Sequence, residues 1–334
     1  MTVLVTGGAG YIGSHMVLVL RDRGEQVMVL DDLSTGLQEL LLPDVPFVQG
    51  DIGDDAVLDA VLSDPSIDTV IHFAARIVVP DSVADPLGYY LNNTVKAHRL
   101  IRACVRHGIK RFIFSSTAAV YGETGSEPVL ETSTLNPISP YGRSKLMVEW
   151  MLRDTAAAHD FKALVLRYFN VAGADPQGRS GQSGRNATHL IKVAVETALG
   201  LRPHMTLFGT DYPTPDGTCI RDYIHVSDLI AAHLCGLDHL RQSPDGFSVY
   251  NCAYGRGASV LEVIDSVKRI SGVDFTVLQA GRRAGDPASI IADGQALRRD
   301  LGWQPRHDSL DEMVRHALQW ERKHSNLQPY SVQS

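Results

Sequence analysis

Tyr141 and Lys145 stand four residues apart, just after Ser139 and Pro140. Serine and proline are typical of a helix N-cap and first turn, so the phenol and the ammonium would share one helix face. A free phenol has a pKa near ~10, and a nearby ammonium favours its ionised form. A lysine at a helix N-terminus is unfavourable with respect to the helix dipole. Its position is therefore better explained by function than by helix stability. The pair predicts a tyrosine that transfers protons; the alternative is an ordinary surface Tyr and Lys.

A glycine motif near the start of the chain predicts a dinucleotide-binding loop. Gly7, Gly10 and Gly13 follow the apolar run 3–5 and lead into the apolar stretch 12–20. Between a strand and a helix, such glycines permit a tight turn, close approach of a pyrophosphate, and close packing of helix on strand. The free N–H groups and the positive dipole end of the helix suit the pyrophosphate. An ordinary flexible loop explains this arrangement less well.

The residue that follows the next apolar run, 27–30, distinguishes NAD from NADP as the expected cofactor. Asp31 follows it, and a carboxylate there accepts hydrogen bonds from the adenosine ribose hydroxyls. It would repel the 2′-phosphate of NADP, and Asp32 adds to that repulsion. No Arg or Lys follows before residue 76. We therefore predict NAD.

Composition excludes several classes of partner. The chain has 334 residues and a net charge of −7, with no run of more than two Lys or Arg, so nucleic acid and anionic membrane are not expected partners. The four cysteines are widely spaced without a CxxC pair, which indicates reduced thiols in a cytoplasmic protein and no metal site. The first strand begins near residue 3, which leaves no room for a signal peptide, and no apolar run reaches membrane-spanning length.

Strand and helix signals alternate through the first half of the chain. Strands are expected at 3–5, 27–30, 47–48, 69–73, 111–114 and 163–167, and helices at 12–20, 54–62, 86–107 and 139–159. This alternation predicts right-handed βαβ units and an α/β fold with a doubly wound parallel sheet of the Rossmann type. Functional groups should then gather at the carboxyl ends of the strands.

The second half differs in composition. Residues 173–187 are rich in Gly, Ser and Arg, which is typical of a mobile loop. A helix is expected at 188–200 and a strand at 205–208, and capping boxes at Ser259 with Glu262 and Ser309 with Glu312 open later helices. We predict a Rossmann domain at 1–172 and a smaller α/β substrate domain at 173–334, partly interleaved with the first.

Together these motifs resemble the extended short-chain dehydrogenase/reductase superfamily, and more closely the UDP-glucose (UDP-galactose) 4-epimerases. The resemblance covers roughly residues 2–325. It is carried by the stretches 5–15, 68–74, 139–145, 166–170 and 211–226. The first and third stretches are typical of the superfamily, and the last is more specific to epimerases.

The resemblance implies roles for individual residues. Tyr141 would be the base, Lys145 would tune it and bind the nicotinamide ribose, and Thr117 would contact the sugar 4′-hydroxyl. The implied NAD-binding residues are Gly7, Gly10, Tyr11, Ile12, Gly13, Asp31, Asp32, Asp51, Ile52, Phe73, Ala74, Ala75, Asn92, Ser115, Tyr141, Lys145 and Tyr168. The implied residues for the UDP-hexose are Thr117, Phe169, Asn170, His189, Leu190, Thr206, Phe208, Arg221, Arg283, Asp286 and Ser289.

Some of these positions keep ordinary alternatives. Thr117 could simply cap local backbone at a strand end, and Arg283, beside another arginine, could be a solvated side chain. Ile77 stands where many bacterial relatives have a lysine, and Arg76 could replace it. At Ser289, where relatives carry a tyrosine or a smaller residue, a serine would leave room for an N-acetyl group and so admit UDP-N-acetylglucosamine.

Several rival functions remain. A 4,6-dehydratase or decarboxylase typically has an acidic residue after the Ser/Thr, where this chain has Ala118. A UDP-glucuronate or UDP-pentose epimerase stays open. A non-catalytic NAD-sensing protein would need neither Tyr141 nor Lys145, and a simple dehydrogenase would need loose cofactor exchange. The helices at 86–107 and 141–159 could pair across a two-fold axis, and the resemblance favours a homodimer.

Overall fold

A seven-stranded parallel sheet, six of whose strands come from the first half of the chain, is the largest in the computed structural model, which describes residues 1–125, 127–184, 188–283 and 287–327. The strands lie in the order β10-β6-β5-β4-β1-β2-β3. Their bounds are β1 Thr2–Thr6, β2 Gln26–Asp31, β3 Phe47–Gln49, β4 Ile67–His72, β5 Arg111–Ser115, β6 Lys162–Tyr168 and β10 Phe247–Cys252. Every neighbouring pair is parallel, so the carboxyl ends of all seven strands lie at one edge.

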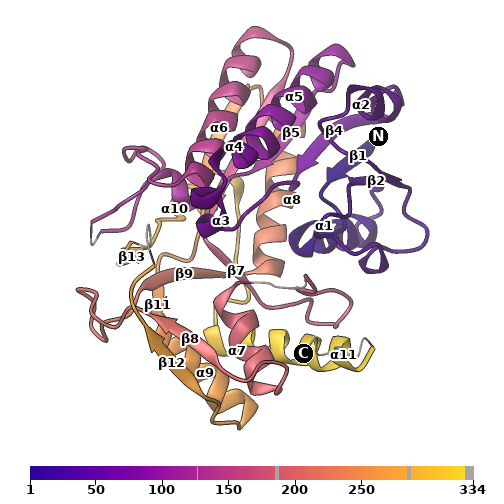
Figure 1. Cartoon of the computed structure of the whole chain (residues 1–334). Coiled ribbons are helices and arrows are strands. Elements are labelled where there is room, and N and C mark those ends of the chain that lie inside the picture. Colours follow the sequence, from indigo (N-terminus) through magenta and orange to yellow (C-terminus); the bar gives the residue numbers. More distant parts are fainter. Residues whose placement is uncertain (126, 185–187, 284–286, 328–334) are drawn as a thin grey trace.

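Helices cover both faces of this sheet (Figure 1). On one face lie α1 (Tyr11–Asp22) and α8 (Val226–Gln242), and on the other α2 (Asp55–Leu62), α5 (Lys96–Arg106) and α6 (Pro140–Ala158). Side chains of β1 alternate between the two cores: Val3 and Val5 pack with α1 and α8, whereas Leu4 packs with α2, α5 and α6. A strand buried on both faces needs the continuous apolar run seen in the sequence.

The segment expected as one helix at 86–107 is divided. It begins with α4 (Pro86–Tyr89), continues as a π-helix over Tyr90–Val95, and becomes α5 at Lys96. The short helix α3 (Val79–Ala84) precedes it. Single π turns are common at functional sites because they redirect the side chains that follow.

The rest of the chain forms a smaller α/β region, in the lower half of Figure 1. One sheet joins β7 (Asn170–Ala172), β9 (Ile220–His225), β11 (Gly257–Ser259) and β13 (Ser289–Ile290), and a second joins β8 (Met205–Phe208) with β12 (Val277–Ala280). The helices of this region are α7 (Leu190–Ala198), α9 (Val260–Ser271) and α11 (Leu310–Leu327), whereas α10 (Gln295–Leu301) packs against β10 and α8 of the large sheet. A common apolar core holds α7, α9 and α11 together. The chain returns to the large sheet with α8 and β10, which are distant in sequence from its other strands.

The loop that composition marked as mobile is held in place as far as Gly184. The Tyr11 hydroxyl donates to the Gly173 carbonyl at 2.6 Å, and the hydroxyls of Ser14 and Ser180 lie 2.7 Å apart. A Cβ on Gly181 would collide with the ring of Trp320. Small residues therefore serve close packing here, and the prediction of mobility was wrong for 173–184. Residues 185–187 lie outside the described part of the chain.

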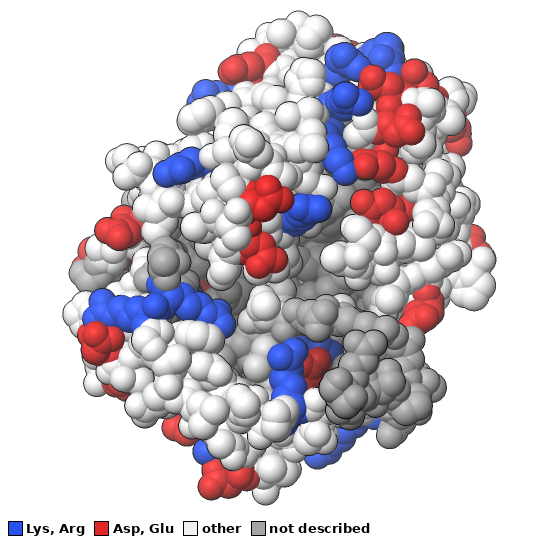
Figure 2. Space-filling model, in the orientation of Figure 1, with Lys and Arg blue, Asp and Glu red and all other residues white. Residues whose placement is uncertain are grey.

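Acidic and basic side chains are interspersed on the face shown in Figure 2. This agrees with the mixed charge of the sequence, which disfavours polyanionic partners. None of the helices in the described part of the chain combines the length and apolarity needed to cross a bilayer.

Candidate active site

The glycine loop has the geometry that its three glycines require. Gly7 has a φ of +74°, and a Cβ there would lie 2.5 Å from the Ala74 nitrogen. A Cβ on Gly13 would collide with the Gly7 carbonyl oxygen. At Gly10 a Cβ would meet only the Gly7 carbonyl oxygen, in a tight contact of 3.3 Å, so the protein crowds this position less than Gly7 and Gly13. Gly10 is the N-cap of α1 and provides no side-chain cap, so the first turn presents its N–H groups to a ligand.

Two carboxylates lie at the end of β2, beside this loop. Asp31 accepts hydrogen bonds from the nitrogens of Ala9 and Leu33, both at 2.9 Å, and burial raises the pKa of its carboxyl. Leu33 has a φ of 58°, which the hydrogen bond to Asp31 helps to maintain. Asp32 is exposed and accepts from Ser34. A diphosphate at the α1 N-terminus and an unphosphorylated ribose at Asp31 match this arrangement, so the residues fit NAD.

The carboxyl ends of the other strands complete this cleft. The nitrogens of Phe73 and Ala74 both donate to the Thr6 carbonyl, which fixes the turn after β4 against the glycine loop. Asn92 lies in the π-helix, where its amide donates to Asn93. The remaining predicted cofactor residues also follow strand ends: Asp51 and Ile52 after β3, Ala75 after β4, Ser115 at the end of β5, and Tyr168 at the end of β6.

Tyr141 and Lys145 lie on the first turns of α6, as their spacing predicted. Ser139 caps this helix by accepting from the Gly142 nitrogen at 3.1 Å, and Pro140 is its first residue. The Tyr141 hydroxyl is hydrogen-bonded to Thr117, and the Lys145 ammonium donates to the Ser115 carbonyl at 2.8 Å. The end of β5 thus meets the start of α6 through two polar contacts.

Burial dominates the electrostatics of this pair. It raises the pKa of Tyr141 to about 12, against the opposing hydrogen bond with Thr117, and lowers the pKa of Lys145 to about 7, against the attraction of Glu149. With a pKa of about 12, the phenol is protonated at neutral pH in the chain without cofactor. The positive charge of an oxidised nicotinamide ring, together with a protonated Lys145, would favour its ionised form.

A buried ion pair that the sequence analysis missed supports the catalytic helix. Glu149, one turn beyond Lys145, accepts from the Arg167 guanidinium at 2.6 Å and from the Ser116 hydroxyl at 2.5 Å. Both charged side chains are at most 4% exposed. Asn93 holds the same helix from the other side, donating to the Ser144 hydroxyl at 3.1 Å and bonding both backbone groups of Arg76. The i, i+4 spacing of Glu149 from Lys145 was the only sequence signal available for this network.

A cavity of about 280 Å³ between the two regions collects most of the predicted substrate residues. Its lining includes Asn170, His189, Leu190, Thr206, Phe208, Arg221 and Arg283. The Arg283 guanidinium lies 3.8 Å over the ring of Phe208. Lining residues that the sequence analysis missed include polar and aromatic side chains of the 173–184 loop, α7 and α11, among them Gln182, Lys192, Trp320 and Glu321. Two arginines beside an aromatic ring suit the diphosphate and the base of a nucleotide.

Other predicted residues lie elsewhere or outside the description. Phe169 packs in an apolar cluster with Ala118, Leu146 and Ile290. Ser289 is partly buried, and its carbonyl accepts from the Thr124 hydroxyl at 3.0 Å. Asp286 lies outside the described residues.

Arg76, the residue that could replace the lysine missing at position 77, lies beside Asp85. Its guanidinium is 57% exposed and lies 3.6 Å from Asp85, whereas Ile77 lines the cavity. A larger hollow of about 650 Å³, between the starts of α9 and α11, shares only Tyr223 with this cavity and contains none of the predicted site residues. The predicted substrate residues therefore gather at the smaller cavity and not at the larger hollow.

Comparison with known proteins identifies the family of this chain. The model of the NAD dependent epimerase/dehydratase family matches residues 3–253. A UDP-glucose 4-epimerase of Azospirillum brasilense is 55% identical, covering 96% of this chain and 92% of its own length. The crystal structure of UDP-glucose 4-epimerase from Brucella ovis in complex with NAD has a TM-score of 0.91 at 42% identity, covering 95% of this chain and 97% of that one. The UDP-Glc/GlcNAc 4-epimerase of Campylobacter jejuni has a TM-score of 0.82 at 46% identity, covering 96% and 99%.

The Rossmann-type fold and the use of NAD expected from the sequence are thereby confirmed. Identity of this level over nearly the whole length of both chains also extends beyond the large parallel sheet, to the region that carries the cavity of about 280 Å³. The chain belongs to the NAD dependent epimerase/dehydratase family and, within it, to the group of the UDP-glucose 4-epimerases.

Proposed function

We propose that this protein interconverts UDP-glucose and UDP-galactose by reversible oxidation at C4 of the hexose. The observation that carries the proposal is the contact of Tyr141 with Thr117 and of Lys145 with the Ser115 carbonyl. The cavity lined by Arg221 and Arg283 also includes Asn170, and the preceding Phe169 packs in a cluster with Ala118, the neighbour of Thr117. The high identity to UDP-glucose 4-epimerases supports it.

In this reaction the protein moves one proton and holds the nucleotide. NAD, when bound, supplies the hydride acceptor and donor for C4. Tyr141 takes the proton of the 4′-hydroxyl and later returns it, while Thr117 holds that hydroxyl against the phenol. Lys145 lies within the same buried site and favours the ionised phenol when it is itself protonated.

Inversion requires a loosely held sugar and a firmly held nucleotide. Arg221 and Arg283 offer guanidinium groups to the diphosphate, and Phe208 offers an aromatic face to the base. Binding energy from this non-reacting part confines the 4-keto sugar while it turns over in the pocket. The apolar cluster of Ala118, Leu146 and Phe169 adjoins the reacting end and provides few fixed polar anchors.

Each rival function either requires a residue that this chain lacks or gives no role to residues that it has. A dehydratase needs an acidic residue directly after Thr117, and the buried Ala118 at that position has no ionisable group. A non-catalytic sensor of NAD has no use for a buried phenol hydrogen-bonded to Thr117. A UDP-glucuronate or UDP-pentose epimerase would use the same centre, and substrate comparison distinguishes them.

We expect the purified protein to interconvert UDP-glucose and UDP-galactose without added NAD. The cofactor is regenerated in each cycle, so a tightly held molecule suffices. Chromatography of the products measures the activity, and acid release of the bound nucleotide identifies it as NAD. Turnover that depends on added NAD and accumulates reduced cofactor would instead indicate a dehydrogenase.

We further propose that the sugar pocket admits an N-acetyl group. The sequence analysis placed the controlling residue at Ser289, but successive residues of a strand face opposite sides, and Ile290 is the one that packs with Ala118 and Phe169. An isoleucine leaves more space than a tyrosine at that point. UDP-N-acetylglucosamine is then a substrate alongside UDP-glucose.

Substitution of the two neighbouring residues identifies which one borders the sugar. Ile290→Tyr should lower kcat/KM for UDP-N-acetylglucosamine relative to UDP-glucose by about tenfold or more, by steric exclusion. Ser289→Tyr is the matched control and should leave that ratio unchanged. If only Ser289→Tyr lowered that ratio, Ser289 would be the residue that borders the sugar. A wild-type protein inactive on the acetylated sugar would contradict the proposal.

We also propose a homodimer formed through α4, the π-helix that follows it, and the neighbouring α6. Leu87, Leu91 and Val95 are 78%, 57% and 42% exposed and recur every four residues along α4 and the π-helix. Trp150 on the neighbouring α6 is 46% exposed. An apolar stripe of this kind pairs naturally with its own copy across a two-fold axis.

Light scattering after size-exclusion chromatography tests this dimer. Leu91→Glu should convert the dimer into a monomer, because it places a charge in the centre of the stripe. Leu278→Glu, at a leucine that is 46% exposed on the distant strand β12, should leave the dimer intact. A wild-type monomer, or equal effects of the two substitutions, would contradict the assignment.

The cytoplasm is the compartment we propose for this activity. All four cysteines are free, and three of them are buried. Such thiols are typical of a reducing compartment.

A further inference from the structure

The turn after β3 lies next to the carboxylate predicted to bind the adenosine ribose. The Gly50 nitrogen donates to the Asp31 carbonyl at 3.0 Å, and Asp51 follows directly. Because adenine is joined to that ribose, a group on this turn is within reach of the base. Ile52 beside it is buried in the core that packs under α5, which anchors the turn.

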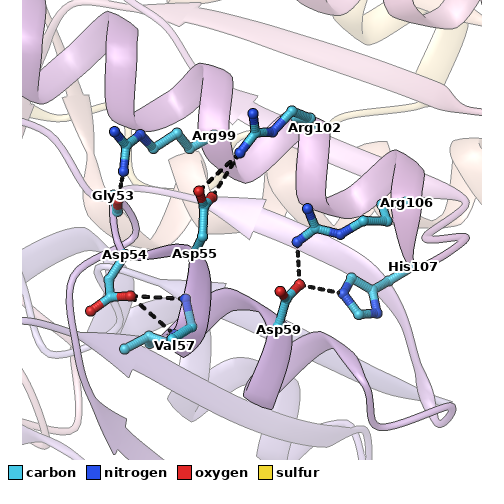
Figure 3. Close-up of polar contacts among 10 residues, drawn as sticks. Gly53, Asp54, Asp55, Val57, Asp59, Arg99, Arg102, Arg106 and His107 are labelled. Carbon is cyan, nitrogen blue, oxygen red and sulfur yellow. Dashed lines mark hydrogen bonds and ion pairs between the residues drawn. The ribbon is translucent and has the colours of Figure 1, made fainter.

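Two basic residues of α5 hold this turn. The Lys96 ammonium donates to Asp51 Oδ2 at 2.6 Å, while the Gly53 nitrogen donates to Asp51 Oδ1 at 2.7 Å. A Cβ on Gly53 would lie 2.8 Å from Cγ of Lys96, so the lysine stem lies directly across the turn. Arg99 donates to the Gly53 carbonyl at 2.6 Å (Figure 3).

The Asp51 carboxylate is held on one side and open on the other. The Lys96 side chain is 22% exposed, whereas that of Asp51 is 42% exposed. Burial by itself would raise the pKa of Asp51, but the hydrogen bonds from Lys96 and Gly53 outweigh it and hold that pKa below its ordinary value. Asp51 is therefore an ionised acceptor at neutral pH with lone pairs still available.

The π-helix sets the direction of Lys96. It ends at Val95, directly before the lysine. One extra residue in a turn rotates everything that follows by about 100° around the helix axis. This irregularity therefore sets the direction in which Lys96 leaves the helix, toward Asp51.

We propose that Lys96 is a positioning residue for cofactor recognition: it fixes the Asp51 carboxylate so that it accepts a hydrogen bond from the exocyclic amino group of adenine. This inference rests on the proposed cofactor site and deepens it. An amino group is a donor, and a carboxylate is an acceptor only, so the pairing also excludes a base that has a carbonyl in that position.

The other ion pairs between α2 and α5 have no such role. Arg102 contacts Asp55 at 3.0 Å, and Arg106 with His107 contacts Asp59 (Figure 3). Their side chains are largely exposed, except for His107, and such pairs contribute little individually. Arg102 is therefore a matched control: it removes a similar contact from the same helix, further from the turn.

Competition between NAD and its deamino analogue, which carries hypoxanthine in place of adenine, tests the proposal. The holoenzyme is exchanged to equilibrium in an equimolar mixture, and the nucleotides released by acid are counted by mass spectrometry. The wild type should retain NAD over the analogue by about tenfold or more, as for a hydrogen bond to a charged group. Lys96→Met should bring the ratio close to one, Lys96→Arg should keep most of it, and Arg102→Met should leave it unchanged.

A merely structural lysine would give a different result. Lys96→Met would then bind both nucleotides more weakly but keep the wild-type ratio, and that outcome would overturn the proposal. A wild type that does not distinguish the two nucleotides would overturn it as well. The measurement counts bound nucleotide, so failure of the proposed epimerase activity would leave this result unaffected, and a thermal melt confirms that each variant is folded.

Discussion

Tyr141→Phe is expected to abolish nearly all epimerase activity while the protein keeps its fold and its NAD. The substitution removes one hydroxyl, whose hydrogen bond is to Thr117, and leaves the ring in place. General-base catalysis commonly contributes ~10²–10⁴-fold to a rate, and we expect kcat to fall by that factor. The rate of UDP-galactose formation and the nucleotide content of the purified variant are the two measurements.

Tyr250→Phe provides the control for Tyr141→Phe. Tyr250 is also a mostly buried tyrosine, on β10 of the same sheet, and it has no part in the proposed site. It should retain wild-type kcat. If Tyr141→Phe also retained wild-type kcat, tyrosine would have no role in the proton transfer, and if it lost its NAD, the effect would belong to binding instead.

Lys145→Met is expected to reduce activity roughly 10²-fold or more and also to weaken the hold on NAD. The substitution keeps the length of the side chain but removes the charge that favours the ionised Tyr141. It also removes the donor to the buried Ser115 carbonyl, at a cost of about 1–3 kcal/mol. Loss of NAD on gel filtration, followed by its absorbance, separates this variant from Tyr141→Phe.

The matched control is Lys162→Met at the start of β6. Lys162 also donates its ammonium to a backbone carbonyl, that of Ser243, but far from the carboxyl edge of the sheet. It should lose some thermal stability and keep both NAD and kcat. Equal losses of activity in the two lysine variants would mean that the loss of a lysine–carbonyl bond, and not the charge beside Tyr141, limits the reaction.

Local sequence was enough to predict much of the first half of the chain. Strands buried on both faces must be apolar throughout, and the runs at β1, β2 and β4 are short and bounded by glycines or polar residues. The capping box at Ser259 with Glu262 also formed as predicted, because both partners lie within one turn. At Ser309 only half of the box formed: the carboxylate of Glu312 bonds to His307, two residues before Ser309, instead.

Prediction was weaker where short elements depend on distant partners. Strands β7, β11 and β13 have only two or three residues and show no periodic pattern, since their backbone is paired through β9. The position of β10 beside β6 was not predicted either, because it too depends on pairing with a strand that is distant in sequence. The loop 173–184 was misjudged because glycine and serine favour both mobility and close packing, and the facing surfaces of α1 and Trp320 decide between them.

The sequence by itself determined the chemistry of this protein. A glycine loop, a carboxylate at the next strand end, and a tyrosine four residues before a lysine are each local, because a strand, a turn or one helical turn sets their geometry. Only the tertiary structure decided what surrounds them. The pairs Glu149 with Arg167 and Lys96 with Asp51 join segments far apart in the chain, and so does the cavity of Arg221 and Arg283. Such contacts depend on how packed elements approach one another, and spacing along the chain does not encode that distance.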